Sequence, residues 1–416
     1  MSVLLKNGTY IDYKTLDFSQ VDILASESGI EILQRGSSVL ADKTIDCSGK
    51  YITHSFADGY MRPEYIFVPS SKYFIAQKTP YFKFLSDVLW KYSQNLDEDL
   101  LRASAMFSAL QAVKNGCTFA IVRLEAPAII EKSFEIVEQE FNRFGVSTLI
   151  SYATGEINGY VKAEKALQAN ADYVKKSQGL MGIDASFLAG KELLEEVVSV
   201  CKQVGVGALI NAGEDHIDEA NTMRDYKTTA VQRLYDSGIM DFSSTILANC
   251  NVISGIERSC IKFKPCWTAE NPIGNLQNAV SPFSSQWLDD NIFYGTDYTG
   301  ENLVATTKMS YFKALGTENA ISTMDAYQRL RAIHRYIEIN GFKGDGQNNL
   351  IVFENPLPME LNKNNFVVQL IFGAKPHGIT AVVSDGKLIV DNSMLLLADV
   401  AEIENFCRQQ INRIIC

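Results

Sequence analysis

The chain has 416 residues, of which 46% are hydrophobic and 21% are charged, and its formal net charge is −11. This composition is ordinary for a globular protein, and the length allows two or three domains or one large α/β barrel with an appendage. The negative charge argues against nucleic acid and against an anionic membrane surface as partners, because both bind basic faces.

No run of about 18 apolar residues occurs, so we expect neither a membrane span nor a signal peptide. The eight cysteines are scattered and contain no CxxC pair. This spacing indicates reduced thiols in a cytoplasmic protein.

Both ends of the chain are rich in short β patterns. Near the N-terminus, Asn7-Gly8 lies between two apolar runs and predicts a hairpin, because this pair accepts the positive φ of a type I′ turn; Ser28-Gly29 predicts a second hairpin. Near the C-terminus, further strands are predicted at residues 349–353, 366–372, 379–383 and 388–390. We therefore expect residues 1–54 and 345–416 to form one composite β-sandwich.

The middle of the chain alternates short apolar runs with amphipathic stretches, which is typical of βα units around a parallel sheet. Eight strands are predicted, at residues 52–57, 119–122, 148–152, 180–183, 208–210, 245–248, 260–263 and 292–294. Helices are predicted at residues 97–114, 129–144 and 191–203. Eight strands close a TIM barrel, so residues 55–344 are predicted to form a TIM-like (β/α)8 barrel, giving an α/β protein.

Polar residues follow several of these strands, at the face where a barrel carries its chemistry. They are Tyr60 and Arg62 after the first strand, Asn211 and Glu214 after the fifth, Asn249 after the sixth and Asp297 after the eighth. We expect these side chains to surround one pocket. Trp267 and Glu270 follow the seventh predicted strand and are further candidates for the pocket wall, with loop packing as the alternative.

The stretch at residues 54–63 resembles the signature that opens the amidohydrolase superfamily, Pro-Gly-Phe-Ile-Asp-x-His-x-His. Segments at residues 211–214, 247–250 and 295–297 resemble the motifs of its deaminase and chlorohydrolase branch. Within that branch, the chain is most similar to the aminohydrolases of selenium metabolism, through residues 89–92, 114–118, 182–187 and 271–280. The resemblance implies a TIM-like barrel with a composite sandwich, a zinc or iron cofactor, a small nitrogenous substrate and a homodimer.

The resemblance also assigns site residues. It puts four metal-binding histidines of the family at Tyr60, Arg62, Asn211 and Asn249, and the last metal ligand at Asp297. Glu214 stands where the family has the carboxylate that moves a proton between water and substrate. Asp184 stands where many members have a histidine that contacts the substrate.

Four of the five ligand positions carry side chains that bind metals poorly. Zinc and iron need imidazole or carboxylate donors, whereas asparagine offers only an amide oxygen and tyrosine must first lose a proton with a pKa of about 10. Arginine stays protonated, and a guanidinium about 4 Å from a divalent ion is repelled by roughly 8 kcal/mol at an effective dielectric near 20. We therefore expect no metal cofactor at this centre, and we expect Arg62 to pair with Asp297 or Glu214.

The four histidines offer one alternative. His216 lies two residues after Glu214, so a shifted metal site of His216, Glu214 and Asp297 is conceivable, although an exposed loop histidine is more common. His334 is expected on a helix surface, and His377 in a loop.

Three functional hypotheses follow. The favoured one is a pseudoenzyme: an amidohydrolase relative without metal-dependent hydrolysis, retained for binding or regulation. The second is a deaminase-type hydrolase that acts on C–N bonds of a small cyclic nitrogenous compound, with a relocated metal or none. The third is a metal-independent enzyme with different chemistry in the same pocket.

Overall fold

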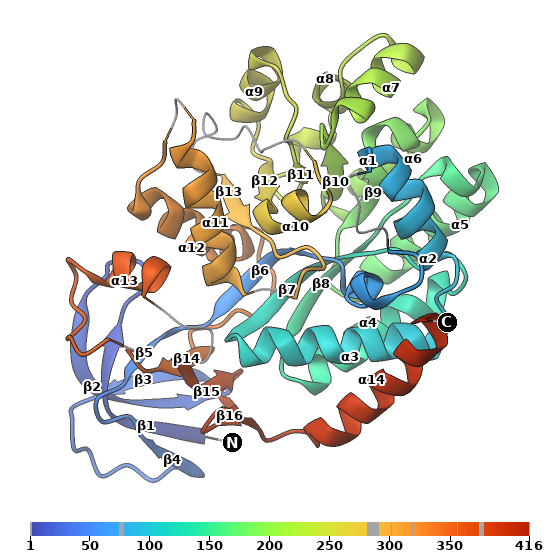
Figure 1. The fold of residues 1–416 in the computed structure, drawn as a ribbon. Coiled ribbons are helices and arrows are strands. Elements are labelled where there is room, and N and C mark those ends of the chain that lie inside the picture. Colours follow the sequence, from blue (N-terminus) through green and yellow to red (C-terminus); the bar gives the residue numbers. More distant parts are fainter. Residues whose placement is uncertain are drawn as a thin grey trace.

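The computed structural model describes residues 2–74, 79–280, 291–300, 302–317, 320–355, 357–373 and 378–415. Figure 1 shows the strands of both chain ends together on one side, and the parallel strands of the middle with their helices on the other. Within these residues, no helix has the length and apolar character needed to cross a membrane. The described cysteines are all free, and His377 lies outside the described residues.

Strands from both ends of the chain share one sheet, which contains nine strands of the described residues. Along its main path the order is β17-β16-β15-β14-β5-β1-β2-β3, and β4 pairs with β1. The bounds are β1 (Ser2–Ile11), β2 (Phe18–Ser26), β3 (Gly29–Leu33), β4 (Lys43–Asp46), β5 (Tyr51–His54), β14 (Leu350–Phe353), β15 (Ile379–Ser384), β16 (Lys387–Asp391) and β17 (Met394–Leu395). Val3, Ile23, Ile52 and Val383 are among the buried side chains of one cluster, so the two chain ends share a core.

The first predicted hairpin is wrong. β1 continues through Asn7 to Ile11, and its pairing with β2 shifts register between Leu5 and Gly8. Asn7 does take a positive φ of 62°, but at this irregularity of a long strand and not in a turn. The second predicted hairpin is confirmed, because β2 and β3 pair in antiparallel fashion.

The middle of the chain contains eight described strands, each parallel to its sheet neighbours. Their bounds are β6 (Phe56–Met61), β7 (Cys117–Leu124), β8 (Ser147–Tyr152), β9 (Met181–Ala185), β10 (Ala208–Ala212), β11 (Ile246–Asn249), β12 (Trp267–Glu270) and β13 (Ile292–Tyr294). They form a three-stranded sheet, β6-β7-β8, and a five-stranded sheet, β13-β12-β11-β10-β9. Isolated parallel bridges join the two sheets at Thr154–Ile183 and at Met61–Asp297.

Helices alternate with most of these strands along the chain (Figure 1). Their bounds are α1 (Tyr81–Phe84), α2 (Trp90–Ser93), α3 (Glu98–Lys114), α4 (Ile130–Arg143), α5 (Tyr160–Val174), α6 (Lys191–Val204), α7 (His216–Tyr226), α8 (Ala230–Ser237), α9 (Gly255–Lys262), α10 (Pro272–Gln277), α11 (Leu303–Leu315), α12 (Thr323–Ile339), α13 (Phe366–Phe372) and α14 (Val400–Ile415). A π-helical turn, η3 (Leu85–Leu89), links α1 to α2. The three helices predicted from the sequence are confirmed as α3, α4 and α6.

Two predicted strands are helices. The apolar run at 260–263 belongs mostly to α9, which starts at a capping box formed by Ser254 and Glu257; the strand of that unit is the shorter β12. The run at 366–372 forms α13, whose buried residues cluster on one face because they recur at helical spacing. In addition, the predicted strand at 52–57 is divided between β5 in the terminal sheet and β6 in the middle.

Candidate functional site

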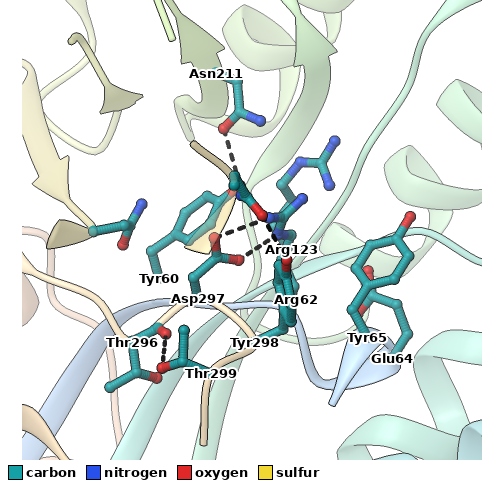
Figure 2. A network of polar contacts seen from close by, with 12 residues as sticks. Tyr60, Arg62, Glu64, Tyr65, Arg123, Asn211, Thr296, Asp297, Tyr298 and Thr299 are labelled. Carbon is teal, nitrogen blue, oxygen red and sulfur yellow. Dashed lines mark hydrogen bonds and ion pairs between the residues drawn. The ribbon is translucent and has the colours of Figure 1, made fainter. Parts of the chain in front are cut away.

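Side chains from the ends of β6, β7 and β10, and from the segment after β13, converge on one buried region (Figure 2). Asp184 of β9 lines a cavity with several of them. Tyr60, Arg62, Asn211, Glu214 and Asp297 are each at most 5% exposed. The predicted positions therefore do lie together, although Tyr60 is part of β6 and not of the loop after it.

Arg62 and Asp297 form a buried, two-pronged ion pair (Figure 2). Arg62 donates from Nη2 to Asp297 Oδ2 over 2.8 Å, and from Nε to Oδ1. The rings of Tyr65 and Tyr298 lie 5.3 Å and 5.1 Å from the guanidinium carbon, within cation–π range. The pairing of Arg62 with Asp297, expected from the sequence, is confirmed.

The other three residues at predicted ligand positions are also engaged with protein partners. Tyr60 donates from its hydroxyl to Asn211 Oδ1 over 3.0 Å. Asn249 Oδ1 accepts from Asn271 Nδ2 over 2.9 Å. Burial is the main cause that raises the pKa of Tyr60 well above its usual value, which makes a phenolate less accessible.

Zinc or iron does not fit this arrangement. The retained carboxylate of Asp297 is paired with the Arg62 guanidinium, which repels a divalent cation, and the protonated Tyr60 phenol is a poor metal ligand. The two amide oxygens already accept hydrogen bonds. The alternative site is not formed either: His216, Glu214 and Asp297 are not among the described residues that come close enough together to hold an ion.

A second buried arginine, Arg123, lies at the end of β7 and was not predicted from the sequence. Its Nη2 donates to Asp184 Oδ1, and its Nη1 lies 3.7 Å from Glu125 Oε2. Glu125 in turn accepts hydrogen bonds from Tyr65 and Ser93. Arg123 directly follows the predicted strand at 119–122 and Glu125 comes two residues later, so charge after a strand end was the available signal.

Glu214 lies beside a small enclosed cavity, which we call the Glu214 pocket. The pocket is lined by Arg62, Tyr81, Leu85, Leu89, Trp90, Arg123, Glu125, Asp184, Ala185, Phe187, Leu188, Asn211, Glu214, Ile217 and Asp218. Its volume, counted as the space that the centre of a water molecule can occupy, is about 20 Å³. The pocket therefore has room for water but not for a ring compound. The residues of α1, η3 and α2 supply one wall.

The pKa of Glu214 is raised to about 7, chiefly by burial, while Arg62 and a hydrogen bond with Tyr81 act in the opposite direction. Burial likewise raises the pKa of Glu125 and of Asp218 to about 7. Carboxyl groups with pKa values near neutrality can both release and accept a proton at neutral pH. The pocket therefore combines two cations with proton-transfer groups.

Five predicted pocket residues do not line the Glu214 pocket. Tyr60 and Asp297 contact its lining residues Asn211 and Arg62, and Asn249 bonds to Asn271. Trp267 and Glu270 lie elsewhere. Trp267 points into the core of the parallel strands, where it stacks on Phe293 at 5.8 Å. Glu270 accepts hydrogen bonds from Ser310 over 2.9 and 3.0 Å and lies 3.5 Å from Arg329. Neither lines the Glu214 pocket, because the seventh strand is β12 and contains both residues.

No protein-family model matches the chain. It is 24% identical to a 5′-deoxyadenosine deaminase of Methanococcus vannielii over 79% of this chain and 81% of that protein. It is 22% identical to a 5-methylthioadenosine/S-adenosylhomocysteine deaminase of Thermococcus onnurineus over 94% of each. Among solved structures, an adenosine deaminase from Xanthomonas campestris with bound zinc superposes with a TM-score of 0.85 at 14% identity, covering 99% of this chain and 98% of that one.

These similarities correct the favoured hypothesis of the sequence analysis. We expected a pseudoenzyme retained for binding or regulation, but the relatives are named as deaminases and point to hydrolytic deamination. The hydrolase alternative agrees better with them. By fold and by sequence, the chain is similar to the deaminase branch of the amidohydrolase superfamily.

Proposed function

We propose that this protein is a deaminase-type hydrolase that cleaves a C–N bond of a small cyclic nitrogenous compound and releases ammonia, with Glu214 as the group that moves protons. One observation carries the proposal: Glu214 is a buried carboxyl with a pKa of about 7, beside a closed pocket that also contains Arg62 and Arg123. The names of the deaminase relatives suggest a purine nucleoside as the substrate class.

In the first step, ionised Glu214 takes a proton from water while the water oxygen bonds to the ring carbon that carries the amino group. The electron pair of the C=N bond moves to the ring nitrogen, which then receives the proton from Glu214. In the second step, Glu214 transfers the remaining hydroxyl proton to the amino group, the C–N bond breaks, and ammonia leaves. The ring carbon keeps the oxygen as a carbonyl.

Arg123 is the group best placed to stabilise charge that develops on the substrate. Its Nε and Nη1 are buried and have no hydrogen-bond partner among the described residues. Donors that are already oriented in a water-poor site stabilise a developing negative charge more than water does. Asp184 holds Arg123 through its remaining nitrogen and acts as a positioning residue.

The Arg62–Asp297 pair has a different part in the proposal. Its guanidinium faces Glu214 and favours the ionised carboxylate, which limits the rise of the Glu214 pKa. We infer that the Arg62 guanidinium is a fixed positive group beside Glu214 that needs no metal ion, although the paired Asp297 carboxylate offsets part of its effect and raises the Glu214 pKa.

Substrate entry requires a change of shape, because the pocket has room only for water. Its wall of Tyr81, Leu85, Leu89 and Trp90 comes from one segment, α1 to α2, that contains a π-helical turn. Such turns are frequent at functional sites. We propose that this segment moves outward to admit the substrate and returns to exclude bulk water.

Barrel closure and the division into two domains also remain part of the proposal. The eight parallel strands are proposed to close into a barrel, and one cluster that takes interior side chains from β6, β7, β8, β10, β11, β12 and β13 supports this. The terminal sheet is proposed to be a sandwich domain of residues 1–54 and 345–416, beside a barrel domain of residues 55–344. The narrower likeness to aminohydrolases of selenium metabolism, a homodimer and a cytoplasmic location stay predictions.

The test is ammonia release from chelator-treated protein with 5′-deoxyadenosine, 5′-methylthioadenosine, adenosine and guanine. We expect turnover of at least one of them, and a loss of about 100-fold or more in kcat for Glu214→Gln. Glu219→Gln is the matched control, because burial raises the pKa of Glu219 to about 8 but its side chain does not line the pocket. Equal loss in both variants would remove the proposed role of Glu214.

A further inference from the structure

We propose that His54, His334 and Asp345 form a binding site for one divalent transition-metal ion, with zinc as the expected occupant. The three residues come from the end of β5, from α12 and from the segment before β14. The site lies at the opposite end of β6 from Arg62, roughly 20 Å along the strand direction, so it is separate from the Glu214 pocket.

The geometry of the three side chains carries the proposal. His54 Nε2 lies 3.1 Å from Asp345 Oδ1, and His334 Nδ1 lies 2.6 Å from Asp345 Oδ2. One ligand atom of each residue falls within 4.8 Å of the other two. Two imidazole nitrogens and one carboxylate oxygen are a known zinc donor set, and they leave a fourth position for water.

The donors are buried and held in place. The side chains of His54, His334 and Asp345 are 5%, 2% and 2% exposed. The ring of Tyr13 stacks on His54 at 4.9 Å and meets His334 edge-on at 5.0 Å. These contacts fix both imidazole planes, so little ordering is needed when an ion binds.

Proton positions allow the ion to enter without a net loss of protons. In the ion-free arrangement, the two ring nitrogens that face Asp345 act as donors, because the carboxylate oxygens of Asp345 accept. When an ion replaces these two hydrogens, each imidazole carries its proton on the other ring nitrogen, as metal-bound histidines do. For His334 that nitrogen is Nε2, so Arg331 must turn away from it and keep only its hydrogen bonds with the carbonyl oxygens of Ser55 and His54. Asp345 keeps its negative charge for the ion.

Among the described residues, Arg331 is a cation in direct contact with one of these three side chains, and its charge opposes the ion. It contacts the far nitrogen of His334, Nε2, at 3.4 Å and not the nitrogen that faces Asp345. Arg331 Nη1 also donates hydrogen bonds to the carbonyl oxygens of Ser55 and His54, over 2.7 and 3.2 Å. The guanidinium is therefore retained by the backbone and lies outside the ring of donors.

An open groove gives the ion a route to the site. The groove, of about 800 Å³, is lined by Tyr13 and His334, by the acidic residues Asp325 and Glu338, and by the cations Lys14, Arg329, Arg331 and Arg335. Water from this groove can supply the fourth ligand. A bound ion would tie α12 to β5 and to the start of β14, where the terminal sheet meets the parallel strands.

The test is a titration of metal-depleted, full-length protein with Co²⁺, followed by its visible absorption, and with Zn²⁺, followed by thermal unfolding. We expect one equivalent to bind and a zinc-dependent rise in Tm. His334→Gln and Asp345→Asn should weaken binding at least 100-fold and abolish the rise, whereas His216→Gln, a histidine outside the site, should behave as the unmodified protein.

Far-UV circular dichroism establishes that each variant is folded, and His54→Gln replaces a variant that is not. The proposal is overturned if the unmodified protein binds no ion, or if a folded site variant binds as tightly as the His216 variant. Ammonia release by chelator-treated protein is a separate measurement, so this proposal and the proposed function can fail independently.

Discussion

Replacing Arg62 with methionine tests the buried ion pair of the Glu214 pocket. The side chains of Arg62 and Asp297 are 3% and 1% exposed, so the substitution leaves a carboxylate buried without its cation. Breaking a buried pair in this way costs about 3–5 kcal/mol. We expect Arg62→Met to lower the free energy of unfolding by that amount. The double variant Arg62→Met/Asp297→Asn, which removes the unpaired charge, should recover part of the loss.

Arg224→Met is the matched control for this experiment. Arg224 holds Asp225 with the same two nitrogens, both at 2.7 Å, but the two side chains are 68% and 40% exposed. An exposed pair contributes about 1 kcal/mol or less, so this variant should unfold almost as the unmodified protein does. Urea unfolding followed by circular dichroism gives the free energies. The reasoning is refuted if Arg62→Met lowers the free energy of unfolding by no more than the control does. It is also refuted if the double variant loses the sum of the losses measured for Arg62→Met and for Asp297→Asn alone.

Three further outcomes are expected. Tyr81→Phe removes a hydrogen bond that favours ionised Glu214, so the pKa of Glu214 should rise above about 7 and the acid limb of the kcat/KM profile should move to higher pH. Burial raises the pKa of Glu64 from 4.5 to about 8, so the stability of the unmodified protein falls as pH rises through 8 and the carboxyl ionises. The free energy of unfolding of Glu64→Gln should therefore exceed that of the unmodified protein by up to a few kcal/mol as the pH rises from about 5 to about 9. Equal pH dependence of unfolding in both proteins would contradict this. Gly182→Ala should sharply reduce the yield of folded protein, because a Cβ there collides with the backbone carbonyl of Tyr152 on β8, whereas Gly255→Ala, which has open space, should be tolerated.

Much of the pocket could be predicted from the sequence because strand ends meet in a parallel sheet. Tyr60, Arg62, Asn211 and Asp297 each follow or end a short apolar run, and these strands place them together. The pairing of Arg62 with Asp297 followed from charge alone, since a buried carboxylate needs a cation. Neither inference required knowledge of side-chain packing.

The errors in the predicted strands arose where a short apolar run fits both a strand and a helix. Residues 260–263 belong largely to a helix whose start was marked by Ser254 and Glu257, and that capping signal was overlooked. The misplaced seventh strand then moved Trp267 and Glu270 into a loop. The capping residues were available in the sequence, but the hydrophobic pattern was given more weight.

The histidine cluster shows what the sequence could not give. His54 and Asp345 are far apart in the chain, and His334 was expected on a helix surface, yet it is 3% exposed. Only the meeting of β5, α12 and the segment before β14 brings the three together. Such non-local contacts leave no periodic signal in one sequence.

The pH dependence of ammonia release by chelator-treated protein tests the central claim most directly. If Glu214 moves the proton, kcat/KM should rise through pH of about 7 as its carboxyl ionises. Glu214→Gln should lose both that limb and about 100-fold or more of the rate, while Glu219→Gln keeps both. A protein that is inactive after chelation and regains activity with added metal, or a Glu214→Gln variant with an unchanged profile, would contradict the account.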